Sequence, residues 1–370
     1  MAIWAILLYR KQEKIVWLGS SKAQFTLLAL WFLAVLLDGF RTESSAWLNE
    51  VLLKLPLILA PIYFVQLNRE SRDMELSLIL LVGFASLTAA VSTINYWLNY
   101  EEINRLLLQS KHVPIYGNMH HIYFGVYMAV SVWISWYYLK RGSYNRLWIV
   151  LGVVLLMCMH ILSSRTGLVA FYISAIVYMA FEAYQRKRWK LLIGGLLVIG
   201  LMPVIGMQVS TSLRNKVLNS LEDFEAVRSG KNINYKSLAM RVEAWKTTVN
   251  VIKAQPLRGV SAVNLENELQ RQYVRDETVL YRENRVGPHN QFLEVSAAHG
   301  LVLGVILLLF MVYWIKDTRG DPWKLALVVL ILVTLLLESL VERQQGLILF
   351  VLCSFALNHL PSSKVIETES

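Results

Sequence analysis

"LLIGGLLVIGLMPVIGMQV", from Leu191 to Val209, decides the fold class of this chain. It carries no charged side chain and approaches the roughly 20 residues that an α-helix needs to cross a bilayer. The whole chain is 56% hydrophobic and only 17% charged, whereas soluble domains are charged at about 25% of positions. The excess apolar surface must therefore face lipid. Four more stretches almost free of charge are Leu147–Leu162, Gly167–Phe181, Leu301–Ile315 and Leu325–Leu337.

The pattern predicts an all-α fold, a polytopic transmembrane helical bundle of about 10–12 spans. We expect these spans near residues 24–40, 51–66, 76–98, 119–139, 147–162, 166–184, 190–209, 291–315, 323–341 and 345–360. Cys158 and Cys353 both fall inside them and are expected to pack as small apolar residues. Ala2–Tyr9 is apolar but too short to span alone, so it is either the end of a longer helix or a half-inserted segment. It lacks the charged start and the small-residue cleavage site of a signal peptide.

The basic residues follow membrane topology rather than nucleic-acid binding, although the formal net charge is +10. They concentrate on alternate short connectors. The positive-inside rule assigns these connectors to the cytoplasm, so the connectors between them face outward. The basic residues on the cytoplasmic side are Lys11, Lys14, Lys22, Arg69, Arg72, Lys140, Arg141, Arg146, Arg186, Lys187, Arg188, Lys190, Lys316, Arg319 and Lys324. We expect no nucleic-acid partner.

One outward connector is long, polar and charged, from about Ser210 to Pro288. Loops of this length in a compact chain are usually functional. Apolar residues at helical spacing predict helices over Ser237–Lys253 and Ala262–Tyr273, with a break at Ala254–Val260. The expected organisation is N-terminal transmembrane helices (1–209), a mostly helical loop domain (210–290), C-terminal transmembrane helices (291–360) and a cytoplasmic tail (361–370).

His289 stands where the loop meets an apolar helix. Gly287-Pro288 fixes a turn just before it, which places the imidazole at the outer membrane–water boundary. An imidazole there can take or give a proton near neutral pH. It can equally cap the helix or hydrogen-bond a headgroup. A metal site is not expected, because His299 is ten positions further on and no HxxxH or HExxH pair occurs.

Three arginines are candidates for binding an anion. Arg165 in "SSRTGL" lies on a short outer connector beside a helix start, where free backbone N–H groups and a guanidinium make a good phosphate site. The alternative is an arginine snorkelling to lipid headgroups. Arg241 lies on an amphipathic helix of the loop, where most arginines are merely solvated, and Arg214 is a weaker third candidate.

Three motifs occur in order on the outer face: "SRTG" at Ser164–Gly167, "RVEAWKTTVNVIKAQPLRGV" at Arg241–Val260 and "HNQFLEVSAAHGLVLG" at His289–Gly304. Together they resemble the O-antigen ligase family and its wider superfamily of O-antigen polymerases, over roughly residues 115–355. Trp245 stands where the family's arginine motif usually has leucine. Leu303 occupies a place that is usually small, with the next small residue at Gly304, which affects helix packing more than chemistry.

The resemblance implies a bacterial inner-membrane glycosyltransferase of the GT-C type whose active site and large loop face the periplasm. Such enzymes need no metal or other cofactor. They transfer a glycan from an undecaprenyl pyrophosphate donor to an acceptor hydroxyl, in ligases that of the lipid A core, with inversion at the anomeric carbon. On this basis His289, as the base, and Arg241 are the candidate catalytic residues. Arg165, Arg241 and Arg214 are the candidates for binding pyrophosphate, and Asn290 orients the imidazole, binds sugar or caps a helix. Membrane lipids are the surrounding partners.

Three other functions remain open from the sequence. A polymerase would use the same donor with another lipid-linked glycan as acceptor, and a protein-directed ligase would use a serine or threonine hydroxyl. A single large outer loop favours a ligase over a polymerase. A transporter would show ionisable residues deep in its spans and internal repeats; His160 and Glu338 are the nearest candidates, and both are predicted near span ends.

Overall fold

The computed structural model describes residues 20–42, 45–66, 72–108, 112–142, 145–162, 164–209, 211–230, 233–318 and 320–361. Within these ranges every regular element is helical, and the predicted all-α polytopic bundle is confirmed. The expectation for Ala2–Tyr9 lies outside the described residues. The described chain divides into two compact units, of which the first holds residues 20–66, 220–317 and 335–359 and the second holds residues 72–219, 318–334 and 360–361.

Five of the described helices are long and apolar enough to cross a membrane, judged by length and composition. They cover Ser21–Phe40, Ala46–Val65, Met74–Leu98, His121–Lys140 and Arg165–Arg186. A sixth span results if the bent pair Leu192–Gln208 and Leu213–Ser229 counts as one, and three shorter apolar helices cover Arg146–Ile161, Pro322–Leu337 and Gln344–Ala356. Many large exposed side chains on the apolar helices are themselves apolar, as at Ile193, Leu197 and Leu201, which suits a lipid environment.

The second unit is built around the buried helix α7. Its elements are α5 (Arg72–Leu98), α6 (Tyr100–Leu108), η2 (Tyr116–Asn118), α7 (His121–Lys140), α8 (Asn145–Ile161), α9 (Arg165–Arg186), α10 (Trp189–Val209), the part of α11 (Thr211–Ser229) up to residue 219 and most of α16 (Pro322–Leu337). Helices α7 and α9 cross closely at two glycines, since a Cβ on Gly167 would lie 2.5 Å from the carbonyl carbon of Gly125. This crossing fixes the start of α9.

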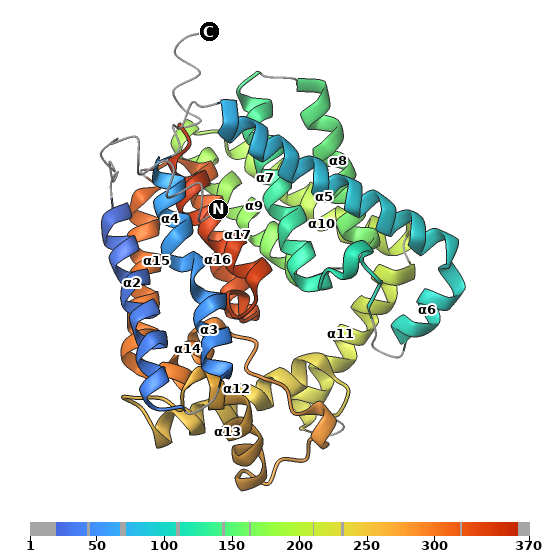
Figure 1. The fold of residues 1–370 in the computed structure, drawn as a ribbon. Coiled ribbons are helices and arrows are strands. Elements are labelled where there is room, and N and C mark those ends of the chain that lie inside the picture. Colours follow the sequence, from blue (N-terminus) through green and yellow to red (C-terminus); the bar gives the residue numbers. More distant parts are fainter. Residues whose placement is uncertain are drawn as a thin grey trace. The chain divides into compact units, whose positions relative to one another are not determined.

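The first unit holds the N-terminal helices, most of the helices of the long polar connector and the remaining C-terminal helices. Its elements are α2 (Ser21–Leu37), η1 (Asp38–Phe40), α3 (Ala46–Lys54), α4 (Pro56–Gln66), α12 (Ser237–Ala254), α13 (Ala262–Arg275), η3 (Arg282–Asn284), α14 (Gln291–His299), α15 (Leu301–Asp317), η4 (Leu340–Glu342), α17 (Gln344–Val351), η5 (Leu352–Ala356) and η6 (Leu357–His359). Helices α2 and α15 run side by side (Figure 1), and Asp317 accepts hydrogen bonds from Ser20 N (2.8 Å) and Gln24 Nε2 (2.9 Å).

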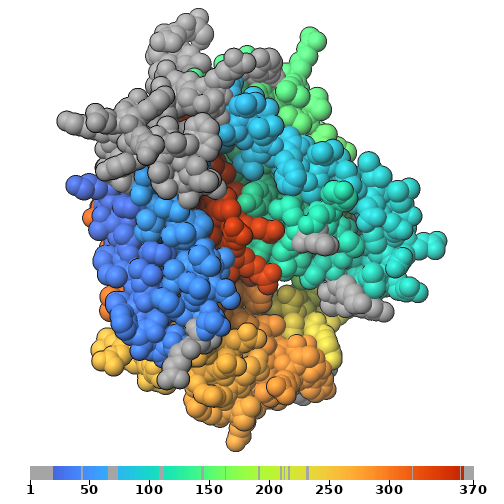
Figure 2. Space-filling model, viewed as in Figure 1, coloured from blue at the N-terminus to red at the C-terminus, as the bar shows by residue number. Residues whose placement is uncertain are grey.

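The loop helices agree with the sequence. The predicted helices over Ser237–Lys253 and Ala262–Tyr273 are confirmed as α12 and α13, with the predicted break between them. Their apolar faces bury a small core with the end of α14, made of Val251, Ile252, Val260, Leu265, Leu269, Ala297 and Ala298. Figure 2 shows this part of the chain as the yellow to orange surface.

The span expected at residues 291–315 is not one helix. It breaks at Gly300 into α14 and α15, because Gly300 adopts φ 91° and Leu301 N donates to Pro256 O (2.8 Å) instead of continuing the helix. A Cβ at position 300 would lie 2.2 Å from Leu257 O, so only glycine lets the loop backbone approach this closely. The expectation of a continuous helix is therefore wrong, and α14 is tied to the loop rather than to α15 alone.

Candidate functional site

His289 ends an extended segment that α12 and α13 hold in place. Three carbonyls of this segment accept hydrogen bonds from side chains of the two helices: Arg285 O from Gln270 Nε2 (3.1 Å), Val286 O from Tyr273 Oη (2.8 Å) and Pro288 O from Trp245 Nε1 (2.7 Å). Burial raises the pKa of the Tyr273 hydroxyl, so it remains a donor over the physiological pH range. Helices α12 and α13 thus fix the chain segment that leads to His289.

The His289 backbone itself lies in the left-handed region, with φ 43°. Few residues other than glycine adopt this conformation, although histidine is among those enriched there. Such a conformation costs on the order of 1–3 kcal/mol and persists only where the surroundings over-determine it. Here the Trp245 hydrogen bond to Pro288 and the helix cap at Asn290 supply that support on either side.

Asn290 is the N-cap of α14. Its Oδ1 accepts hydrogen bonds from the backbone N–H groups of Phe292 (3.0 Å) and Leu293 (3.1 Å), which would otherwise lack partners at the helix start. Its Nδ2 donates to Leu336 O (3.1 Å) in the last turn of α16. Of the roles considered from the sequence, the structure therefore gives Asn290 the cap, and adds a tie to the end of α16.

Glu338 joins His289 to Arg241. One carboxylate oxygen, Oε1, lies 2.8 Å from His289 Nδ1, and the other, Oε2, accepts from Arg241 NH2 at 3.2 Å. The Glu338 side chain is 6% exposed, against 16% for Arg241 and 31% for His289. The three residues therefore form a mostly buried cluster, the His–Glu–Arg cluster, in which only the imidazole has substantial access to its surroundings.

Arg241 reaches this cluster from the second turn of α12. Its NH1 donates to Leu337 O, the last residue of α16. Carbonyls at a helix C-terminus lack partners within the helix and carry partial negative charge, so they favour a cation. Arg241 is accordingly held by a carboxylate and by a helix end together.

The cluster fixes the protonation pattern of the imidazole. An ionised carboxylate can only accept a hydrogen bond, so Nδ1 of a neutral His289 carries the proton that Glu338 accepts. The lone pair is then on Nε2, which can take a proton from a hydroxyl within reach. A carboxylate also stabilises the imidazolium that results. The arrangement can act chemically as an oriented general base.

A second set of buried polar contacts holds the segment that carries Glu338. Gln291 at the start of α14 donates from Nε2 to Glu342 Oε1 (2.6 Å) and accepts from Val341 N (2.7 Å), and Lys54 Nζ donates to Glu342 Oε2 (2.6 Å). Burial would raise the pKa of the Glu342 carboxyl, but the Lys54 ammonium and the two hydrogen bonds outweigh it and lower that pKa. Glu342 thus stays ionised and anchors η4.

The remaining candidates, Arg165 and Arg214, lie in the second unit. Arg165 is the first residue of α9, as predicted, and is half-buried; the preceding Ser164 donates from Oγ to His121 O (3.3 Å). Arg214 lies in the first turn of α11 and is exposed. The structure therefore brings His289, Asn290 and Arg241 together in the first unit and carries the other two arginines in the second.

Sequence reasoning missed Glu338 as a site residue. The sequence presents it only as an ionisable group near the end of a predicted span, a position that weighs against a transporter. The signal available was a carboxylate beside the charge-free stretch Leu325–Leu337, since such a group needs a partner. Nothing in the sequence named His289, 49 positions earlier, as that partner. Within the described residues no group of three or more His, Cys, Asp or Glu side chains is placed to hold a metal ion.

Fold and cluster together define a multi-pass α-helical membrane protein with an oriented imidazole beside the helices α12 and α13. Residues 150–308 match the family model of the O-antigen ligases. The match agrees with the resemblance predicted from the three motifs, and over this region the chain is similar to the O-antigen ligases. No curated protein matches the chain. All five candidate residues predicted from the sequence fall inside the matched region, and Glu338 lies outside it.

Proposed function

We propose that the protein is an O-antigen ligase. It transfers a glycan from undecaprenyl pyrophosphate to a sugar hydroxyl of the lipid A core, at the periplasmic face of the bacterial inner membrane. The family match over residues 150–308 supports glycan transfer of the ligase or polymerase type in general. The observation that carries the enzymatic part is the 2.8 Å contact between His289 Nδ1 and Glu338, because it leaves Nε2 as a proton acceptor.

In the proposed reaction the oxygen of the acceptor hydroxyl attacks the anomeric carbon of the donor glycan. The bond between that carbon and the pyrophosphate oxygen breaks, and undecaprenyl pyrophosphate leaves with the bonding electrons. Nε2 of His289 takes the proton of the attacking hydroxyl, and Glu338 stabilises the imidazolium. Direct displacement of this kind inverts the anomeric carbon, and neither a metal ion nor a nucleotide takes part in it.

The leaving pyrophosphate gains negative charge, which preplaced cations stabilise best in a low-dielectric site. We assign this role to Arg165, with its helix start, and to Arg214. Arg241 is already paired with Glu338 and with the end of α16. Its proposed contribution is therefore to balance the charge of Glu338 as well as to contact the donor.

The proposed enzyme has the membrane arrangement expected from the sequence. Residues 1–209 and 291–360 supply the transmembrane helices, residues 210–290 form a periplasmic loop domain, and the tail at 361–370 is cytoplasmic. The positive connectors support this orientation. The polyprenyl chain of the donor and the lipid part of the acceptor then both approach from the bilayer.

Deletion of the gene in its host, followed by lipopolysaccharide electrophoresis, tests the function. We expect loss of the O-antigen ladder, an intact lipid A core and accumulation of lipid-linked polymer. A single-repeat band would identify a polymerase instead, and an unchanged pattern would exclude both. Complementation with His289→Ala or Arg241→Ala should leave the ladder absent at normal protein abundance. The matched control is Arg282→Ala, which removes an exposed loop arginine and should restore the ladder.

A further inference from the structure

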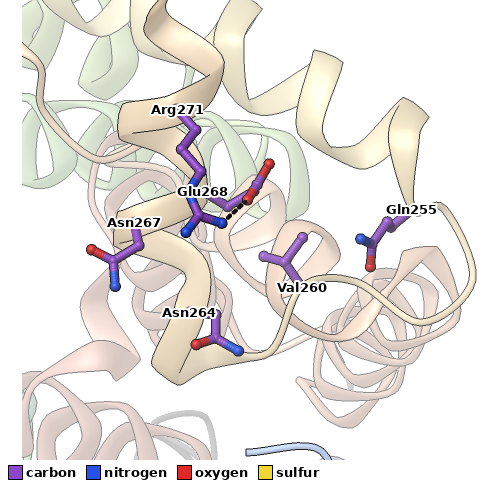
Figure 3. A pocket seen from close by; sticks show the side chains of 6 residues that line it. All are labelled: Gln255, Val260, Asn264, Asn267, Glu268 and Arg271. Atoms are coloured by element: carbon purple, nitrogen blue, oxygen red, sulfur yellow. Dashed lines mark hydrogen bonds and ion pairs between the residues drawn. The ribbon is translucent and has the colours of Figure 1, made fainter.

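The loop domain contains a second polar feature, a pocket of ≈ 290 Å³ at the junction of α12 and α13 (Figure 3). Its lining residues are Gln255, Val260, Asn264, Asn267, Glu268 and Arg271. All six belong to the first unit, and none belongs to the His–Glu–Arg cluster. The volume lies near the lower end of the range for small-ligand sites in proteins.

Three side-chain amides give the pocket unused hydrogen-bonding capacity. In the described part of the chain, the amides of Gln255, Asn264 and Asn267 make no hydrogen bond to another protein group, and all three residues are exposed. Each amide offers an acceptor oxygen and two donor hydrogens side by side. In Figure 3 the apolar Val260 side chain lies between Gln255 and the residues of α13.

The charges of the pocket cancel each other. Glu268 accepts from Arg271 NH1 at 3.3 Å and from Arg275 NH1 at 2.9 Å, and its side chain is 20% exposed. The Glu268 carboxylate would repel an anion, and the arginines would repel a cation. An apolar ligand would leave the amides without hydrogen-bond partners. A neutral ligand with adjacent hydroxyl groups is the class that fits, because each hydroxyl both donates and accepts and its C–H face can rest on Val260.

The wall of the pocket is held rigid by backbone contacts. Val260 N and Ser261 N donate to Ala297 O (2.9 Å) and Ala298 O (2.8 Å) of α14. A Cβ on Gly259, which has φ 60°, would lie 2.4 Å from Ala298 O. From the other side, the Arg41 guanidinium donates to Arg258 O (2.9 Å) and Gly259 O (2.8 Å). A wall fixed in this way loses little entropy when a ligand binds.

The same contacts set the distance between pocket and cluster. The pocket wall is bonded to Ala297 and Ala298 near the end of α14, whereas Asn290 and His289 stand at its start. At 1.5 Å per residue the helix separates the two places by roughly 10 Å. A short oligosaccharide can cover this length.

We propose that the amide pocket is a carbohydrate subsite that holds a sugar residue of the glycan substrate at a fixed distance from His289. This inference rests on the proposed transfer function and names a binding place for its substrate. The bound sugar belongs either to the donor polysaccharide or to the core acceptor, since both present adjacent hydroxyl groups.

Direct binding tests the subsite separately from catalysis. The full-length protein is purified in detergent, and O-polysaccharide and core oligosaccharide, both released from host lipopolysaccharide by mild acid, are titrated in separate calorimetry experiments. One of them should bind the wild type, and binding to Asn264→Ala/Asn267→Ala should weaken at least about tenfold, since two amides are lost. The matched control Glu266→Ala changes an exposed residue of the same helix outside the pocket and should bind as the wild type does.

Transfer assays with the same variants separate the two proposals. The double variant should raise the KM for the glycan that binds, at an unchanged kcat, and His289→Ala should keep glycan binding while losing transfer. Equal binding by the wild type and the double variant would overturn the subsite and leave the transfer function standing. If the wild type transfers glycan but binds neither glycan in calorimetry, the subsite would likewise be overturned and the transfer function would stand. If the wild type performs no transfer but the double variant still binds glycan more weakly than the wild type does, the subsite would be supported and the transfer function refuted.

Discussion

At the scale of single residues, Glu338 is the side chain on which the proposed base depends. We predict that Glu338→Gln lowers the kcat of glycan transfer by about 10²–10⁴-fold with little change in KM, because an amide does not stabilise the imidazolium and no longer fixes the tautomer. Steady-state transfer assays with purified protein measure this. Glu266→Gln on the exposed face of α13 is the control. A kcat equal to that of the wild type would remove Glu338 from the mechanism.

The sequence predicted which residues belong to the site better than it predicted which side chains contact one another there. His289, Arg241 and Asn290 were found because motifs and a turn mark them, and the structure groups them. The carboxylate that connects the first two comes from the end of a distant helix, and pairing across 49 positions depends on tertiary packing that no local pattern encodes. Whether Arg165 and Arg214 act at the same site stays a prediction.

At the scale of elements, the break between α14 and α15 is the feature that ties the loop to the membrane helices. We predict that Gly300→Ala destabilises the protein by at least about 2 kcal/mol, since alanine is strained at positive φ and its Cβ would overlap the backbone at Leu257. Thermal unfolding of the detergent-purified protein measures the loss.

Gly194→Ala in α10 is the matched comparison for this substitution. A Cβ there meets nothing within 4 Å, so the change should lie within about 1 kcal/mol of zero. If the two alanine variants unfold at the same temperature, the close approach at Gly300 has no energetic importance.

Helices were predicted well where their apolar period is long and local, as for α12 and α13. The break at Gly300 was missed because a glycine within an apolar stretch is compatible with a continuous helix. What breaks the helix is the loop backbone at Pro256 and Leu257, and that approach follows from the folding of the loop domain.

At the scale of the whole molecule, the orientation of the loop domain decides whether the proposed site faces the periplasm. Cys158 and Cys353 are buried free thiols, so the natural protein gives a low background with a membrane-impermeant maleimide. We predict that Leu257→Cys, at a position 73% exposed, is labelled in intact spheroplasts. Arg188→Cys, on a predicted cytoplasmic connector, should be labelled only after lysis. The reverse pattern would place the loop in the cytoplasm and exclude a periplasmic site.

The left-handed backbone at His289 has a practical consequence for capturing a substrate complex. An inactive protein that still binds both substrates needs a side chain that removes the base without disturbing the turn, and most residues strain at φ 43°. Asparagine tolerates this conformation and is close to imidazole in polarity, whereas a β-branched residue would distort the chain just before the α14 cap. His289→Asn is therefore the substitution of choice for cryo-electron microscopy of the loaded, stalled protein.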